Sequence, residues 1–403
     1  MTPGSSTISL NPCETDFVQD PYPFYARWRE ECPVFFWEEL GHWCFARHQD
    51  VSALLRDRRF GRQILHVATR EELGWPETPA HLRPFYAFEE HSLLELEPPV
   101  HTRLRGFINP SFLPRQIARL QPRIERLAND LIDRFPAGKT TDLITSFAEP
   151  VPVMVIAGFL GVPEEMAPQI LSWSHDMVAM YQARRDRGIE DRAVAATITF
   201  SGYMRELLAE RRREPGEDFL SQLATARDEQ GTALTEDELV TTAILLLNAG
   251  HEATVHALGN GVQALLRHGK SADFLENPTT CSEEMLRFDA PLHMFKRYAL
   301  EDIEYAGLRL RKGDQIGLLL GSANRDEEKF LEADRFAANR SPNPHVSFGG
   351  GIHFCVGAPL ARLEMQTALR VLFERLPDLR LDGTARYRDT WHFHALESLP
   401  VTW

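Results

Sequence analysis

The stretch FGGGIHFCVGAPLARLE, Phe348 to Glu364, places one cysteine between a run of glycines and the start of an amphipathic helix. The glycines allow the backbone to turn tightly around Cys355 and to aim its N–H groups at one point. The positive end of the following helix adds to the effect, and such surroundings favour a thiolate over a thiol. A lone thiolate presented in this way predicts a single axial ligand for iron.

The same loop carries the spaced residues of a known family. It resembles the haem-ligand loop of the cytochrome P-450 superfamily at Phe348, Gly349, Gly351, His353, Cys355, Gly357 and Ala358. The resemblance extends over almost the whole chain and implies a mainly α-helical fold with a minor β region, shaped as a triangular prism. It also implies one haem b (iron protoporphyrin IX) per chain, with Cys355 as the metal ligand. The haem is then expected between a long central helix and the helix that follows the cysteine loop.

The length alone would suggest two or three domains, but nothing in the sequence marks a boundary between them. The chain has 403 residues, of which 43% are hydrophobic, and contains no Pro-, Gly- or Ser-rich linker, internal repeat or low-complexity block. We therefore expect a single domain over residues 1–403, with its β-rich part at about 34–47, 297–320 and 380–403 and helices elsewhere. The formal net charge of −14 argues against nucleic acid as a partner, because phosphate binding requires a basic surface.

No targeting or membrane segment is expected. The start MTPGSSTISLNPCETDF lacks a basic region followed by an apolar core, and the apolar stretch from Val151 to Val162 is shorter than the roughly 18 residues that a membrane span requires. The 5 cysteines are widely spaced and include no CxxC pair, which fits a reducing compartment better than a disulfide framework or a zinc site. These features predict a cytoplasmic protein without a membrane partner.

A second stretch, AILLLNAGHEATVHALGNG from Ala243 to Gly261, is unusually polar for an apolar helix pattern. Thr235 and Glu238 form a capping-box pattern before it, and Gly269 supplies a stop, so we expect a helix of about 33 residues. A glycine costs about 1 kcal/mol against alanine inside a helix, and a buried carboxylate costs more unless it is paired. The pattern therefore indicates that something large lies against this helix.

Within that helix, AGHEAT at residues 249–254 resembles the oxygen-binding motif of the family. Spacings of three and four put its small residues on one expected face: Ala249, Gly250, Ala253 and Ala257. That face would leave room for a flat ring and O2. The resemblance assigns Glu252 as the proton source and departs from the family at Ala253, where most members have threonine. Because Thr254 is rotated by about 100° from Ala253, it cannot simply substitute, and the resemblance implies that it keeps its ordinary structural role. One hypothesis is that a substrate hydroxyl or an ordered water completes proton delivery.

Two short charged patterns gain a role from the resemblance. Glu284 and Arg287, three residues apart, would on their own suggest an exposed ion pair. The family joins such a pair to a third residue, here Arg340, in an ionic network that holds the cysteine loop. His101 and Arg105 would on their own suggest a solvated helix face.

The family also indicates how the haem is held. Its propionate-binding positions match His101, Arg105, Arg297 and His353 in this chain. Several donors for two carboxylates are chemically reasonable, because charge-assisted hydrogen bonds are about twice as strong as neutral ones. Together with Phe348, Gly349, Gly357, Ala249 and the ligand Cys355, these are the expected haem-binding residues.

Three segments are expected to surround the substrate: 60–97, 291–297 and 393–395. Leu292, Met294 and Phe295 favour a small to medium, largely apolar compound. The histidines His251, His293 and His394 leave a polar or hydroxylated compound open.

The resemblance implies an enzyme that activates O2 with two electrons and hydroxylates an organic substrate. No flavin or nicotinamide motif is present, so we expect a ferredoxin with ferredoxin reductase, or a flavodoxin, as partner. A positive docking surface is expected at Arg115, Arg119, Arg123 and Arg126, with a solvated helix face as the alternative. Two other interpretations remain open: a peroxide-driven or oxidative-coupling protein of the same fold, and a haem-binding sensor without turnover.

Overall fold

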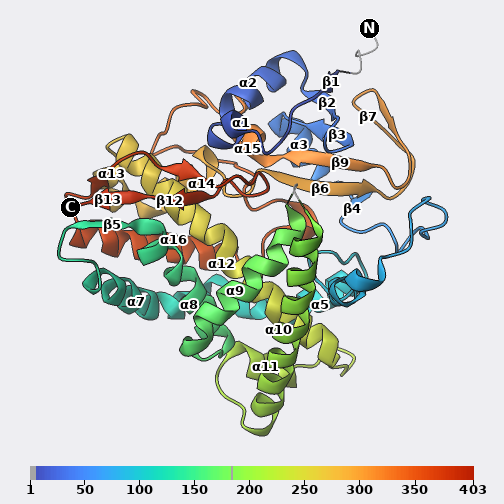
Figure 1. Cartoon of the computed structure of the whole chain (residues 1–403), viewed down its shortest axis with the longest axis horizontal. Helices are drawn as coiled ribbons and strands as arrows, with labels where there is room; N and C mark the ends of the chain where they lie inside the picture. Colours follow the sequence, from blue (N-terminus) through green and yellow to red (C-terminus); the bar gives the residue numbers. More distant parts are fainter. Residues whose placement is uncertain (1–5, 183–184) are drawn as a thin grey trace.

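Helices make up most of the chain, as the computed structural model of residues 6–182 and 185–403 shows (Figure 1). The α-helices of the described residues are α1 (Thr15–Gln19), α2 (Tyr22–Glu31), α3 (His48–Leu54), α4 (Arg83–Glu89), α5 (Val100–Ile108), α6 (Pro114–Ile117), α7 (Gln121–Asp133), α8 (Pro150–Leu160), α9 (Ala167–Val178), α10 (Arg187–Arg213), α11 (Phe219–Thr225), α12 (Glu236–Arg267), α13 (Ser271–Glu276), α14 (Pro278–Phe288), α15 (Leu320–Ala323) and α16 (Ala358–Arg375). The strands are β1 (Thr7–Ile8), β2 (Val34–Trp37), β3 (His42–Phe45), β4 (Phe60–Gly61), β5 (Thr140–Asp142), β6 (Met294–Ala299), β7 (Ile303–Tyr305), β8 (Leu308–Leu310), β9 (Gln315–Leu319), β10 (Arg380–Leu381), β11 (Arg386–Tyr387), β12 (Leu396–Ser398) and β13 (Pro400–Thr402). The expected mainly α-helical fold with a minor β region is confirmed.

The largest sheet joins strands from the first 61 residues to strands from residues 294–319. Its strand order is β1-β2-β3-β9-β6-β4, so an N-terminal hairpin is extended by strands from beyond residue 290. Arg297 on β6 lies opposite Ile316 on β9, and Trp43 on β3 pairs with the same residue from the other side. Strands occur in all three segments expected to be β-rich, but β1, β4 and β5 lie outside them. Those strands have two or three residues, too few to show an alternating pattern.

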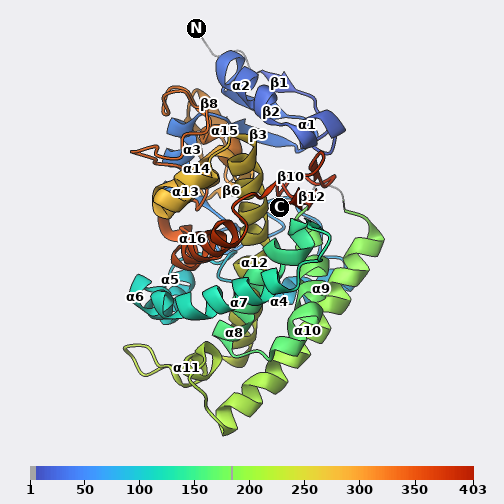
Figure 2. The same ribbon diagram turned by 90° about the vertical axis from the view of Figure 1, so that its left-hand side faces the viewer.

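Helix α12 occupies the centre of the molecule (Figure 2). It begins at Glu236 after the expected capping box, in which Thr235 accepts from the Glu238 N–H and the Glu238 carboxylate accepts from the Thr235 N–H. Around it pack α8, α9, α10, α14 and α16. The outline is broad at the sheet end and narrows toward α11 in the view of Figure 1.

Most of the hydrophobic core surrounds α12, and a separate aromatic cluster beside the sheet contains Phe17, Trp28, Trp37 and Trp391. This arrangement fastens the N-terminal helices to the C-terminal segment. Within residues 6–182 and 185–403, no helix is both long and apolar enough to pass through a bilayer.

Candidate active site

The cysteine loop depends on two glycines with left-handed backbone. Gly349 has φ +71° and Gly351 has φ +66°, a region that L side chains rarely adopt. A Cβ on Gly351 would also lie 2.5 Å from the Leu55 carbonyl oxygen. The turn brings the Cys355 N–H within 3.0 Å of the Phe348 carbonyl oxygen and leads directly into α16. Glycine is therefore required here both for conformation and for space.

The Cys355 side chain is exposed. Desolvation within the loop raises the pKa of its thiol, and the backbone N–H groups of Gly357 and Ala358, together with Arg105, act in the opposite direction. The preference for a thiolate stays a prediction. A coordinated metal ion deprotonates a thiol outright, so bound iron would add to the stabilisation that these donors give the sulfur.

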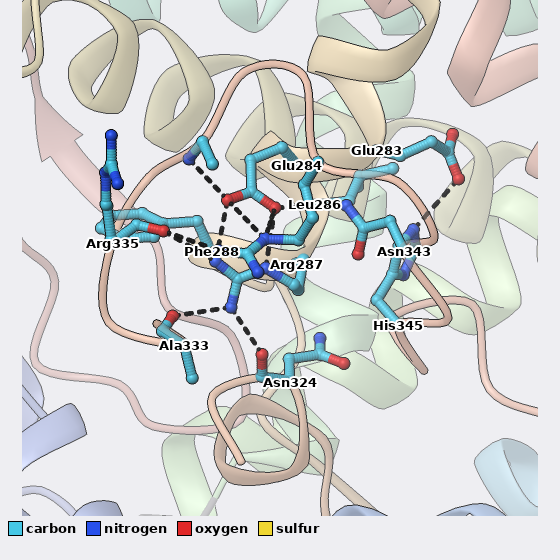
Figure 3. Close-up of polar contacts among 12 residues, drawn as sticks. Glu283, Glu284, Leu286, Arg287, Phe288, Asn324, Ala333, Arg335, Asn343 and His345 are labelled. Atoms are coloured by element: carbon cyan, nitrogen blue, oxygen red, sulfur yellow. Dashed lines mark hydrogen bonds and ion pairs between the residues drawn. The ribbon is translucent and has the colours of Figure 1, made fainter. Parts of the chain in front are cut away.

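Glu284 and Arg287 form a buried pair that anchors this loop (Figure 3). Both side chains are fully buried, with Arg287 Nε and Nη2 donating to the carboxylate at 2.7 and 2.8 Å, so the exposed-pair alternative is wrong. Arg340 Nε, 3.0 Å from Glu284 Oε2, completes the expected network. Arg287 Nη1 also donates to the carbonyl oxygens of Asn324 and Ala333, each at 2.8 Å. The pair therefore ties α14 to the chain leading into the loop.

A neighbouring network was not expected from the sequence. Glu283 accepts from Arg362 Nε at 2.6 Å and Nη2 at 2.7 Å, and lies 3.1 Å from His345 Nε2. The Arg362 guanidinium carbon also lies 4.5 Å from the centre of the Phe348 ring. These contacts join α14 to α16 on either side of the loop. The repeated acid in the sequence EEMLR was the one available signal.

Two of the expected propionate ligands have no carboxylate partner among the described residues. His101 is buried, and both of its ring nitrogens are without a hydrogen bond within the described part of the chain. Arg297 is also buried, donates to the Lys296 carbonyl oxygen, and has no ion pair with a described carboxylate. Burial lowers the pKa of Arg297 to about 9 and that of His101 to about 4. A buried cation and an unpartnered imidazole fit a group that brings its own carboxylates, as haem does.

The other two expected propionate ligands, Arg105 and His353, already have hydrogen-bond partners in the protein. Arg105 donates to the carbonyl oxygens of Ile352 and Phe354, which precede the cysteine. The His353 ring lies 4.6 Å from the His101 ring between centroids, with the two planes inclined at 56°, and His353 Nε2 lies 3.2 Å from Glu97 Oε1. The structure thus brings all four residues to the cysteine loop. It also adds Glu97, a carboxylate that sequence reasoning missed although it precedes His101 by four residues.

The expected small-residue face of α12 is accessible at Ala249 and Ala253 but not at Ala257, which is buried. Ala249 is exposed and Ala253 is partly exposed on a helix that is otherwise largely buried, so they leave open surface beside the core. A Cβ on Gly250 would instead lie 2.8 Å from Ile156 Cγ1 of α8. The glycine therefore permits close packing of α8 and α12, not room for a ring. Thr254 is buried, and its hydroxyl lies 3.4 Å from the Gly250 carbonyl oxygen within its own helix.

Glu252 is surrounded by histidines. Its Oε2 lies 3.4 Å from His251 Nε2 and 3.5 Å from His175 Nε2, and its Oε1 lies 3.8 Å from His256 Nε2. Burial raises the pKa of Glu252, but the neighbouring imidazoles of His251 and His256 outweigh it and hold the pKa well below the usual range. The Glu252 carboxylate is therefore ionised near neutral pH. It can accept a proton transiently and donate it onward.

The expected substrate walls are adjacent, but their histidines are occupied. Leu292 pairs with Phe393 in an isolated antiparallel bridge. His394 Nδ1 lies 2.7 Å from Asp289 Oδ1, and His293 Nδ1 lies 2.9 Å from the Tyr25 hydroxyl. Both histidines are buried in this network, so they are not free anchors for a polar substrate.

One of the four arginines of the predicted docking surface is already in an ion pair. Arg123 forms an ion pair with Glu164 at 2.9 Å. Arg115, Arg119 and Arg126 are exposed and form no ion pair with the described residues. They lie on or between α6 and α7, which pack against α16, the helix that begins after the cysteine loop.

Comparison with known proteins gives one consistent result. Residues 76–275 and 279–377 match the family described as Cytochrome P450. The biotin biosynthesis cytochrome P450 of Bacillus subtilis (strain 168) is 37% identical over 403 residues, covering 98% of this chain and 99% of the relative. The vitamin D(3) 25-hydroxylase of Pseudonocardia autotrophica is 36% identical over 397 residues, covering 96% and 94%.

A solved structure matches equally well. P450BioI, crystallised with an acyl carrier protein ligated to hexadec-9Z-enoic acid, has a TM-score of 0.89 and 36% identity, covering 97% of this chain and 100% of that one. Relatives are named as a monooxygenase and as hydroxylases, which supports turnover and not the sensor alternative.

Proposed function

The chain belongs to the cytochrome P450 family, and on that premise we propose that this haem-thiolate monooxygenase hydroxylates a small to medium, largely apolar organic compound. The observation that carries the proposal lies beside the Cys355 loop: the His101 ring has no hydrogen-bond partner, and the buried Arg297 guanidinium has no ion pair, among the described residues. They provide counter-groups for two propionates, while the accessible surface at Ala249 and Ala253 supports an apolar ring face. Leu292 and Phe393, which pair in a β-bridge, are proposed to supply apolar side chains on the substrate side.

When bound, haem supplies the O2-activating chemistry, and a thiolate ligand favours O–O cleavage. The protein's part is to hold and orient. Cys355 provides the sulfur, the N–H groups of Gly357 and Ala358 stabilise its charge, and the buried Glu284–Arg287 pair keeps the loop in place.

Glu252 is proposed to relay protons. The side chain of His175 is 37% exposed and its Nε2 lies 3.5 Å from Glu252 Oε2, so it can carry protons from outside to this carboxylate. Ala253 has no hydroxyl to continue the path, and Thr254 is turned toward its own helix. We assign the last step to a substrate hydroxyl or an ordered water.

A ferredoxin with its reductase, or a flavodoxin, is the proposed electron source. Arg115, Arg119 and Arg126 offer an exposed positive surface on elements that pack against α16. An acidic partner would be attracted to this surface even though the whole chain carries a net charge of −14.

The test compares the native protein with Ala253→Thr, using a surrogate ferredoxin and reductase, NADH, and two probes named with relatives, hexadec-9Z-enoic acid and vitamin D3. We expect O2-dependent hydroxylation of at least one probe, with a ratio of product to NADH that does not improve in the variant. An improved ratio would show that the missing hydroxyl limits the native protein.

A peroxide-driven reaction is the second candidate, because Ala253 departs from the usual relay. The retained Glu252 argues against it. Product formed with hydrogen peroxide alone, and none with O2 and the electron-transfer proteins, would favour this candidate over the first.

A further inference from the structure

The histidines around Glu252 have the spacing of metal ligands. The Nε2 atoms of His175 and His251 lie 3.5 and 3.4 Å from the same oxygen, Glu252 Oε2, and all three atoms lie within 4.8 Å of one another. Zinc bonds of about 2.0–2.2 Å place neighbouring ligands of a tetrahedral ion about 3.3–3.6 Å apart. The observed distances to Oε2 agree with that separation. They are longer than a charged hydrogen bond prefers, about 2.7–2.9 Å.

The ring of His251 is already oriented for a cation. Its Nδ1 lies 2.7 Å from the Leu247 carbonyl oxygen, which can only accept, so Nδ1 carries the hydrogen. In the neutral ring, Nε2 then holds a lone pair, and this buried atom has no hydrogen-bond partner in the described chain. Its lone pair faces the negative Glu252 Oε2. A backbone carbonyl that fixes the tautomer in this way is a common second partner of a metal-bound histidine.

We propose that His175 Nε2, His251 Nε2 and Glu252 Oε2 bind one zinc ion, distinct from the haem iron. Two imidazoles and one carboxylate leave the fourth tetrahedral position for water. The partly exposed His175 provides access, and His256, at the other oxygen, steadies the carboxylate. Arg388, from the C-terminal segment, faces His175. Its positive charge is balanced by Glu149, which lies 3.6 Å away.

The other buried histidine cluster lacks these features. Asp289 accepts from the hydroxyls of Tyr22 and Tyr387 and from His394, and His293 Nδ1 is bonded to Tyr25. Most of the atoms that could bind a metal in this cluster already take part in hydrogen bonds. All three candidate ligands of the cluster are also buried.

The experiment measures zinc binding to the haem-loaded protein after treatment with a chelator. Isothermal titration with zinc chloride is combined with metal analysis of desalted protein. We expect one zinc per haem in the native protein, and a loss of affinity of at least about tenfold in His175→Ala and Glu252→Gln. The matched control is His81→Ala, which removes another histidine–glutamate pair, His81–Glu190 at 2.7 Å, and should leave zinc binding unchanged.

Native protein that binds no zinc, or that binds it no more tightly than the folded His175→Ala variant, would overturn the proposal. If His175→Ala does not fold, Glu252→Gln decides in its place. Zinc would occupy the His175 Nε2 and Glu252 Oε2 atoms that the proposed proton relay uses, so the relay would operate only in the zinc-free protein. Zinc that binds as described and yet leaves O2-dependent turnover unchanged would support the site and refute the role of Glu252 in proton transfer.

Discussion

Replacing Glu284 with glutamine should destabilise the protein severely, although it changes only one oxygen to an amide nitrogen. The carboxylate accepts from Arg287 and Arg340, and also from the Ala337 N–H at 2.8 Å and Asn343 Nδ2 at 3.2 Å. An amide can accept at one end only, and its NH2 would face donors at the other end. The fully buried Arg287 would then lose its counter-ion.

The size of the effect follows from burial. Removing one partner of a buried ion pair costs about 3–5 kcal/mol, because the remaining charge stays out of water. Urea unfolding of the haem-loaded protein, followed by far-ultraviolet circular dichroism, measures the change in unfolding free energy. Loss of the haem Soret band in the same titration reports the cysteine loop.

A matched control separates burial from charge. Glu332 and Arg335 have the same three-residue spacing and lie 2.8 Å apart, but their side chains are 59% and 68% exposed. Glu332→Gln should cost less than about 1 kcal/mol, as exposed pairs do. If Glu284→Gln costs no more than this control, the reasoning from burial is refuted.

Three further changes test the site, the pH response and the partner surface. Arg297→Gln should lower haem affinity about tenfold or more, measured by transfer to apomyoglobin, whereas Arg309→Gln, at an 89% exposed side chain, should not. Burial lowers the pKa of His42 to about 4. Below about pH 6.5 the unfolded chain therefore binds a proton that the folded protein does not, and about 2 kcal/mol of stability present at neutral pH is lost by pH 5. His42→Gln should reduce the difference between unfolding free energies at pH 7 and pH 5 by that amount, and an unchanged difference would contradict the assignment. Arg119→Glu should slow reduction by ferredoxin in a salt-dependent way, and equal rates at all ionic strengths would exclude docking there.

The sequence was most informative where a signature is local. The glycines around Cys355 and the spacing of Glu284 and Arg287 depend on turns and helical periodicity, which act over a few residues. The start of α12 was predicted correctly for the same reason, since a capping box is complete within four residues. The family resemblance then supplied Arg340, a partner that spacing alone could not identify.

Contacts between distant segments were beyond such reasoning. His175 meets Glu252 only because α9 packs on α12, and Glu97 reaches His353 across more than half of the chain. Neither of these contacts produces a periodic pattern in the sequence.

The sequence by itself determined the family, the iron ligand and the central helix, because each rests on residue types at short, regular spacing. Only the tertiary structure decided that Gly250 faces Ile156 and that Glu252 lies among histidines. It also placed Arg105 beside the Cys355 loop, where it donates to the carbonyl oxygens of Ile352 and Phe354. Helix orientation and desolvation depend on what packs from elsewhere in the chain, and no local pattern records those neighbours.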